Sequence, residues 1–367
     1  MTRTQQYIVL AVLTLGTMAV MAVGLAIVAS MISAPAAPAT TTSPAGFTPL
    51  ESQPATALNP TGLPASPLPE MLASVTLPPT MTASPLPFEP TAQPDTTAWV
   101  EQHLASLTLS DKIGQMIMMG VSGQASSDYT CSLILDISPG SVVYVGDNVV
   151  RPEQLRQFSA ALKDCHDRNP AGIPLWVAMD NEGQYVYRYD TQATIFPAAM
   201  AFGAADDLDL AFQAALRGGG ELAYSGVNMV LGPDADLLTN YDNDVISVRS
   251  YGGDPLRVSA MVASATRGYQ AAGLVPVLKH FPGHGGVAAD SHYSLPVDQA
   301  SLESLRSTYL PPFQSGIDAG AQVVMFSHVS FPAVDSSGLP ASLSPVIIDL
   351  LRQELGFNGV ILTDSLG

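Results

Sequence analysis

The chain has 367 residues, only 13% of which are charged, and its 32 acidic and 14 basic side chains give a formal net charge of −18. An acidic surface repels phosphate backbones, which argues against nucleic acid as a partner. The two cysteines, Cys131 and Cys165, belong to no C-x-x-C or Cys/His cluster, which argues against a structural zinc site. They could pair as a disulfide in an exported domain or remain two separate buried thiols.

An uncharged run at 7–32 is made mostly of Val, Leu, Ala, Met and Ile. A membrane-spanning helix needs about 20 apolar residues, whereas the apolar region of a cleaved signal has about 7–15. The run therefore predicts a transmembrane anchor over residues 1–33. Arg3 lies on its N-terminal side, so the positive-inside tendency places the rest of the chain outside the cytoplasm, on a single-pass anchor.

Residues 34–96 form a Pro/Thr/Ser/Ala-rich segment that holds half of the chain's 30 prolines. Such a composition cannot bury enough surface to offset chain entropy, so it predicts a disordered linker. The folded domain is expected to start near Thr97 and to cover residues 97–367.

The folded part alternates short apolar runs with longer amphipathic stretches. The runs are continuous, as expected for strands covered on both faces, and lie at 115–119, 140–145, 174–179, 227–231, 274–278, 321–326 and 359–363. Trp99, Leu104 and Leu107 have the spacing of a first helix, and a second helix opens at 109–112. Further helices are expected at 152–168, 208–225, 255–272, 302–319 and 345–355.

Strand–helix alternation of this kind predicts an α/β fold with a parallel sheet. Seven such strands over about 270 residues favour a (β/α)₈ TIM-type barrel that stops before its eighth strand. The alternative is a doubly wound open sheet, but the turn at 121–124 is not the Gly-rich phosphate turn which that fold requires.

Polar side chains cluster where these strands end, which is the face that carries the active site of a barrel. They are Asp180, Glu182, Asp234, Asp236, Lys279, His280, His328 and Asp364. Asp234, Asp236 and His328 could equally pack the rim, and the sequence assigns them no role.

The densest stretch is 279–292. His280 and His284 are four residues apart, but the proline and glycine between them exclude a regular helix, which argues against a metal site. Asp290 and His292 are two residues apart, so in an extended loop the carboxylate can orient the imidazole. This pair is a candidate acid/base dyad.

Five motifs in order resemble glycoside hydrolase family 3, in its bacterial β-N-acetylhexosaminidase branch. They are LSDKIGQM at 109–116, DNEG at 180–183 with Arg188, VRSYG at 248–252 with Asp254 and Pro255, KHFPGHG at 279–285 with DSH at 290–292, and LGFNGV at 355–360 leading to Thr363 and Asp364. By this resemblance residues 97–367 are the family's N-terminal catalytic domain.

The resemblance implies a retaining double displacement without a cofactor or metal. Asp364 is the implied nucleophile, His292 the acid/base, and Asp290 the group that orients it. Most retaining glycosidases use two carboxyl groups instead, and a histidine suits the role because its unperturbed pKa is near 6.5. The side chains implied to bind the sugar are Asp180, Arg188, Arg249, Lys279 and His280.

The sequence departs from the family at two places. Gln184 and Tyr185 stand where the family usually has a glycine and an arginine, and the chain ends three residues after Asp364. We therefore expect this chain to be a fragment that is poorly stable and nearly inactive, because the strands at 115–119 and 359–363 would each expose an unpaired edge.

The expected function is the removal of β-linked N-acetylglucosamine from glycans or cell-wall fragments such as those of peptidoglycan. Three alternatives stay open: a β-glycoside phosphorylase or β-glucosidase of the same family, an inactive membrane-tethered glycan-binding protein, and a tethered scaffold. Neither a binder nor a scaffold needs an acid/base dyad, so Asp290, His292 and Asp364 favour an enzyme.

Overall fold

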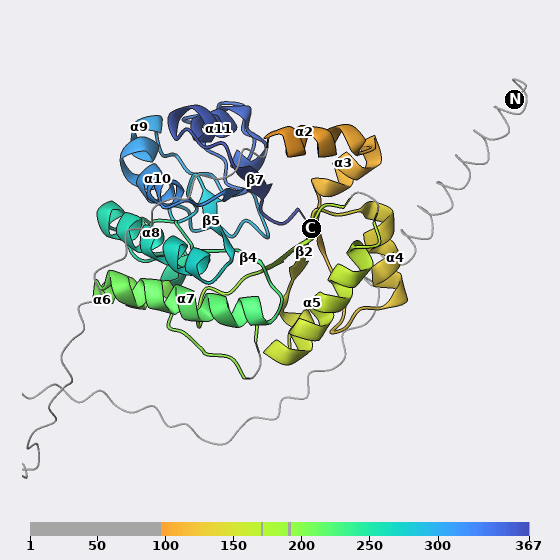
Figure 1. Ribbon diagram of the computed structural model, residues 1–367. Helices are drawn as coiled ribbons and strands as arrows, with labels where there is room; N and C mark the ends of the chain where they lie inside the picture. Colours follow the sequence, from red (N-terminus) through yellow and green to blue (C-terminus); the bar gives the residue numbers. More distant parts are fainter. Residues whose placement is uncertain (1–96, 170–171, 190–191, 367) are drawn as a thin grey trace, which may run out of the picture. The chain divides into compact units, whose positions relative to one another are not determined.

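The computed structural model describes residues 97–169, 172–189 and 192–366 (Figure 1). The predicted anchor at 1–33 and the predicted linker at 34–96 lie outside these residues, so both stay predictions. Within the described ranges, no helix is both long enough and apolar enough to span a membrane.

Seven parallel strands form the sheet of the described domain, and their spatial order follows the chain. They are β1 (Met118–Gly120), β2 (Ser141–Tyr144), β3 (Trp176–Met179), β4 (Met229–Val230), β5 (Val275–Phe281), β6 (Val323–Phe326) and β7 (Val360–Thr363). Each predicted strand is confirmed. The first begins later than predicted, because Gln115 still belongs to a helix.

Helices follow the strands and surround the sheet (Figure 1). The α-helices are α2 (Thr97–Ser106), α3 (Leu109–Gln115), α4 (Asp128–Ile137), α5 (Pro152–His166), α6 (Ala199–Ala205), α7 (Leu208–Tyr224), α8 (Pro255–Ala271), α9 (Leu302–Ser304), α10 (Leu310–Asp318) and α11 (Pro345–Asp349). Shorter turns are the 3₁₀ segments η1 (Gly146–Asn148), η2 (Ser247–Arg249) and η4 (Ala341–Leu343) and the π-helical segments η3 (Leu305–Tyr309) and η5 (Leu350–Glu354). The fold is thus a curled parallel βα sheet.

Capping side chains fix where several helices begin. Asp254 accepts a hydrogen bond from the backbone N–H of Arg257 at the start of α8, and Asp207 caps α7 in the same way. Ser344 caps α11, with Pro345 at the first helical position. Each cap satisfies backbone donors that the first helical turn leaves free, which is why these helix starts could be predicted.

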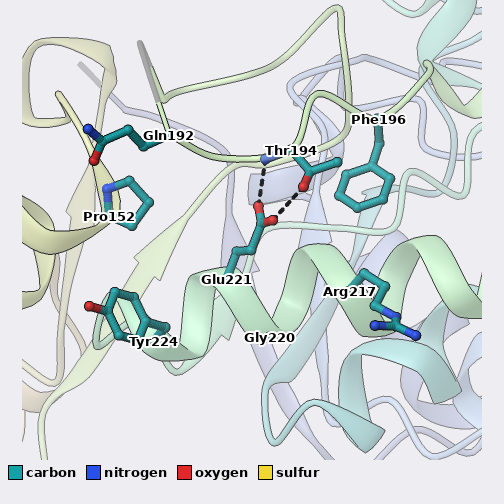
Figure 2. A pocket seen from close by; sticks show the side chains of 8 residues that line it. All are labelled: Pro152, Gln192, Thr194, Phe196, Arg217, Gly220, Glu221 and Tyr224. Carbon is teal, nitrogen blue, oxygen red and sulfur yellow. Dashed lines mark hydrogen bonds between the residues drawn. The ribbon is translucent and has the colours of Figure 1, made fainter.

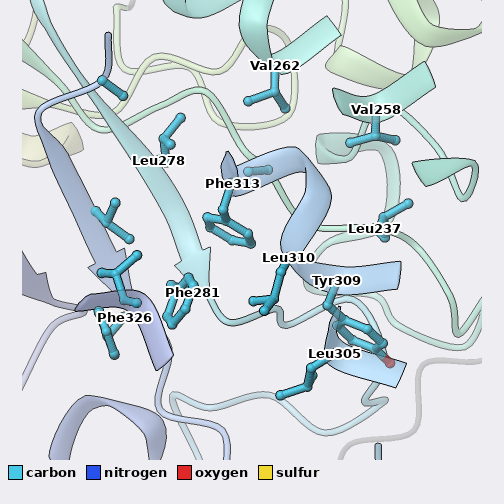
Figure 3. Packing of buried hydrophobic residues seen from close by; sticks show 14 of the residues in the cluster. Leu237, Val258, Val262, Leu278, Phe281, Leu305, Tyr309, Leu310, Phe313 and Phe326 are labelled. Atoms are coloured by element: carbon cyan, nitrogen blue, oxygen red, sulfur yellow. The ribbon is translucent and has the colours of Figure 1, made fainter. Parts of the chain in front are cut away.

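The largest buried cluster packs α8 and α10 against the sheet beneath the ends of β5 and β6 (Figure 3). Phe281, the last residue of β5, contacts Phe313 of α10 and Phe326 of β6, with ring centroids 5.2 Å and 4.8 Å apart. All three rings are fully buried. They fill the space between α10 and the sheet at the ends of β5 and β6.

A disulfide joins α4 to α5. The Cys131 and Cys165 sulfurs are 2.13 Å apart and their Cα atoms 5.5 Å apart. The Arg168 guanidinium lies against both sulfurs. Of the two possibilities that the sequence leaves open, the structure therefore has the bonded pair.

Candidate active site

A buried lysine forms the centre of the polar cluster at the strand ends. The Lys279 side chain, on β5, is only 3% exposed. Its Nζ donates to Asp180 Oδ1 at 2.7 Å and lies 2.6 Å from Glu182 Oε1. Both acids follow β3, so two non-adjacent strands share one ammonium group. An unpaired ammonium at this depth would be very costly, and the two carboxylates offset that cost.

Two arginines complete the pairing of these acids. Arg249 of η2 makes a bidentate contact with Glu182, with distances of 2.7 Å and 2.9 Å, and Arg188 donates to Asp180 Oδ2 at 3.0 Å. Burial alone would raise the pKa of Asp180 and Glu182. The charges of Lys279 and the arginines outweigh burial and hold both pKa values below their usual range. Both acids are therefore ionised at neutral pH.

Asp236 anchors His280 to the chain that follows β4. Its Oδ2 accepts from His280 Nδ1 at 2.7 Å and from the His280 backbone N–H at 3.2 Å, while its Oδ1 accepts from the His284 N–H at 2.6 Å. A carboxylate oxygen accepts here, so His280 Nδ1 carries the hydrogen. The Nε2 side of His280 faces Arg249, whose Nη2 is 3.4 Å away.

Asp234, Asp236 and His280 offer ligand atoms within 4.8 Å of one another, close enough to consider a metal ion. However, the Arg249 guanidinium lies 3.8 Å from Asp234 Oδ2, and Asp236 already binds His280. The pKa of Asp234 is raised well above its usual value by burial and by the charge of Asp236. The guanidinium beside Asp234 and the hydrogen bond from His280 to Asp236 already occupy these carboxyl groups, so the cluster fits an internal polar network better than a metal site.

The glycines of the 279–285 segment let it pass close to other backbone. A Cβ on Gly285 would lie 1.8 Å from the carbonyl oxygen of Leu237. At Gly283, φ is +152°, and a Cβ there would lie 2.4 Å from the Tyr309 ring. Only glycine fits either position, which explains why the motif needs both residues.

The predicted dyad lies on an exposed loop after β5. His292 donates to Asp290 Oδ1 twice, from ring Nδ1 at 2.7 Å and from its backbone N–H at 2.8 Å. The His292 side chain is 64% exposed and that of Asp290 34%. Although burial acts to raise the pKa of Asp290, the hydrogen bonds from His292 lower it. Because Nδ1 is engaged, Nε2 is the ring atom available for proton transfer.

One contact ties this loop to the buried network. Ser291, between the two dyad residues, places its Oγ 3.1 Å from Nε2 of the buried His284. His284 in turn is fixed by Asp236 through its backbone N–H.

Asp364 follows β7 directly. Its backbone N–H donates to the carbonyl of Phe326 at 3.0 Å and extends the β6–β7 pairing by one residue. Its Oδ1 accepts from the backbone N–H of Ser365 at 2.8 Å. Burial would raise the pKa of Asp364, but the charge of His280 and the Ser365 hydrogen bond lower it, so the group is an anion at neutral pH.

The structure brings the five predicted sugar-binding residues into one ion-pair network at the strand ends. It also shows partners to which the sequence assigned no role, namely Glu182, Asp234, Asp236 and His284. The first three had been singled out by their positions after β3 and β4. No sequence pattern indicated that Glu182 would share Lys279 with Asp180 and bind Arg249.

A separate open hollow of about 640 Å³ lies over α7 (Figure 2). Glu221 accepts there from the backbone N–H and hydroxyl of Thr194, at 2.9 Å and 2.6 Å. Its other lining residues are Pro152, Gln192, Phe196, Arg217, Gly220 and Tyr224. These residues are distinct from the predicted site, whose groups come from the strand ends.

Comparison with known proteins agrees with this geometry. A curated β-hexosaminidase from Xylella fastidiosa (strain M23) is 36% identical over 259 residues, covering 69% of this chain and 75% of that protein. The structure of a glycoside hydrolase family 3 β-N-acetylglucosaminidase from Paenibacillus sp. str. FPU-7 is 41% identical with a TM-score of 0.69, and the match covers 71% of this chain and 50% of that one.

A third similar protein is NagZ from Neisseria gonorrhoeae, solved in complex with N-trifluoroacetyl-D-glucosamine. It is 30% identical with a TM-score of 0.63, and the match covers 68% of this chain and 74% of that one. Residues 108–367 also match the glycosyl hydrolase family 3 N terminal domain. The chain therefore belongs to glycosyl hydrolase family 3, in its bacterial β-hexosaminidase branch.

Proposed function

We propose that this chain carries the catalytic domain of a retaining exo-β-glycosidase that removes β-linked N-acetylglucosamine. The observation that carries the proposal is the Asp290–His292 hydrogen bond, which leaves His292 Nε2 available for proton transfer in a domain that also holds the ionised Asp364 at the end of β7. The names of the similar proteins support the choice of sugar.

In the first step, an Asp364 carboxylate oxygen attacks the anomeric carbon while the bond to the leaving oxygen breaks. His292, protonated on both nitrogens, gives its Nε2 proton to that oxygen, and the negative charge of Asp290 stabilises the imidazolium. In the second step, Nε2 takes a proton from water as the water oxygen displaces Asp364. The sugar leaves with its original anomeric configuration.

We assign sugar binding to Asp180, Arg188, Arg249, Lys279 and His280. Arg188 and Asp180 are the more open members, with side chains 31% and 18% exposed, and are best placed to reach hydroxyl groups. The other three are at most 11% exposed and mainly hold the first two in position. Such preorganised charges orient a polyol without having to rearrange at the moment of reaction.

For the whole protein we propose a (β/α)₈ barrel, supported by seven parallel strands whose spatial order follows the chain. We also propose that the domain lies outside the cytoplasm on an N-terminal anchor. The apolar run at 7–32 supports the anchor, and the Cys131–Cys165 disulfide supports an oxidising compartment. Cell-wall fragments are then an accessible substrate.

The first prediction concerns substrate and acceptor. Full-length protein should hydrolyse aryl β-N-acetylglucosaminides much faster than aryl β-glucosides, and added phosphate should leave the rate unchanged. Measuring release of the aryl group and of the free sugar, with and without phosphate, tests both points. Formation of a sugar 1-phosphate would show a phosphorylase, and a preference for glucosides would show a β-glucosidase.

Asp364→Asn should abolish turnover while leaving the fold intact, because an amide cannot form the glycosyl-enzyme bond. Losing a nucleophile costs several orders of magnitude in rate. kcat should be compared with that of Asp349→Asn, a matched change in α11. Near-normal turnover by the purified Asp364 variant would reject its role as nucleophile.

His292→Ala should slow substrates with poor leaving groups more than those with good ones, since a good leaving group departs without a proton. General acid help is worth about 10²–10⁴-fold. A series of aryl glycosides that differ in phenol pKa measures the dependence, and Asp290→Ala should show a weaker version of it. A uniform loss across the series would argue against His292 as the acid.

For localisation, protease added to intact cells should cut within 34–96 and release a soluble catalytic domain. The predicted linker supplies the cleavage sites, and the predicted anchor should stay in the membrane fraction. Immunoblotting of supernatant and membrane fractions provides the measurement, with a cytoplasmic protein as control. Cleavage that requires prior lysis would place the domain inside.

A further inference from the structure

His328 stands at the end of β6, the strand that pairs with β7 next to Asp364. The pairing of β6 with β7 continues to Phe326 and Thr363, so the residues that follow the two strands remain close together. His328 is half-buried, and neither the sequence motifs nor the proposed mechanism gives it a role.

Both ring nitrogens of His328 are engaged. Nε2 lies 2.8 Å from the carbonyl oxygen of Ser365, and Nδ1 lies 2.7 Å from Oγ of Ser342. A carbonyl oxygen can only accept, so Nε2 must carry the hydrogen. In the neutral ring Nδ1 then accepts from the Ser342 hydroxyl, and one tautomer is fixed.

Ser342 is itself held firmly. It lies in η4, and its backbone N–H donates to the carbonyl of Ser327 at 3.1 Å. Its neighbour Ala341 donates to the carbonyl of Val329 at 2.8 Å. The residues before and after His328 are therefore both hydrogen-bonded to η4. These contacts fix the position of Ser342 relative to the His328 ring.

Ser365 connects the ring to the carboxylate. Its carbonyl accepts from His328, while its N–H donates to Asp364 Oδ1 at 2.8 Å. Holding Ser365 at its carbonyl restricts the backbone rotations that would turn its N–H away from Asp364. Burial acts to raise the pKa of Asp364, and the hydrogen bond from the Ser365 N–H is one of the contacts that lower it.

We propose that His328 is a positioning residue for Asp364, acting through Ser365 to fix the carboxylate in the orientation needed for attack. This inference rests on the proposed function, in which Asp364 is the nucleophile. The donor at Nε2 is the part of the ring that matters, because it alone reaches the residue that binds the carboxylate.

Two amide variants separate this role from simple packing. His328→Gln places an amide N–H₂ near the position of Nε2 and retains a donor for Ser365. His328→Asn is one methylene shorter, so it can keep the contact with Ser342 but cannot reach Ser365. The two side chains otherwise have the same chemistry, and thermal unfolding of both variants checks that they fold alike.

His328→Asn should lower kcat by about 10²-fold with little change in KM, since a misplacement of about 1 Å costs about that much. The loss should be the same for good and poor leaving groups, unlike that of His292→Ala. His328→Gln should recover most of the rate. Rates are expressed per active site, titrated with a fluorosugar that traps the covalent intermediate.

Equal kcat values for the Asn and Gln variants, whether both high or both low, would overturn the proposal. An independent readout is the ¹⁵N NMR spectrum of the His328 ring, which should show the Nε2-protonated tautomer in the wild type; an Nδ1-protonated ring would also overturn it. All rates are measured on the full-length protein. If the full-length wild type lacks glycosidase activity, the proposed function fails instead, and the tautomer still reports on the contact.

Discussion

The buried ammonium of Lys279 is the constraint on which the site depends. The free-energy cost of burying that charge is offset only because Asp180 and Glu182 both contact it. This contact requires the carboxyl ends of β3 and β5 to lie at the same level in the sheet. Arg249 then follows, since Glu182 bonded to Lys279 still has acceptor capacity for a guanidinium. Lys279, Glu182 and Arg249 are themselves buried, so these charges interact with one another in a low dielectric.

The site has a fixed half and an open half. The strand-end network is largely buried, with Arg188 and Asp180 as its more open members, whereas the dyad lies on a loop with His292 largely exposed. A glycosidase of the proposed type needs both properties. The sugar must be held rigidly at its hydroxyls, while the acid/base must first face a leaving group and then admit water to the same place.

Much of this could be predicted from the sequence. The seven strands are continuous apolar runs, and caps such as Asp254 and Ser344 mark helix starts, so both signals are local. Helices α4 and α6 were not predicted, because short segments have weak periodicity. The Cys131–Cys165 bond and the sharing of Lys279 by two acids depend on distances that only the fold determines. The positions of polar residues directly after the strands located the site, but they could not predict which acidic side chain pairs with which basic one.

Because His292 donates two hydrogen bonds to one oxygen of Asp290, the geometry of the dyad does not depend on contacts with the rest of the domain. Its geometry is closed within three consecutive residues, so the loop can change its position without disturbing the relation between acid and base. The geometry of the acid/base pair therefore depends only on residues 290–292. The position of the loop that carries the pair depends on a different contact, that of Ser291 with His284. Evolution could then retune which leaving groups are accepted by altering the loop's length or anchoring while the catalytic pair itself stays unchanged.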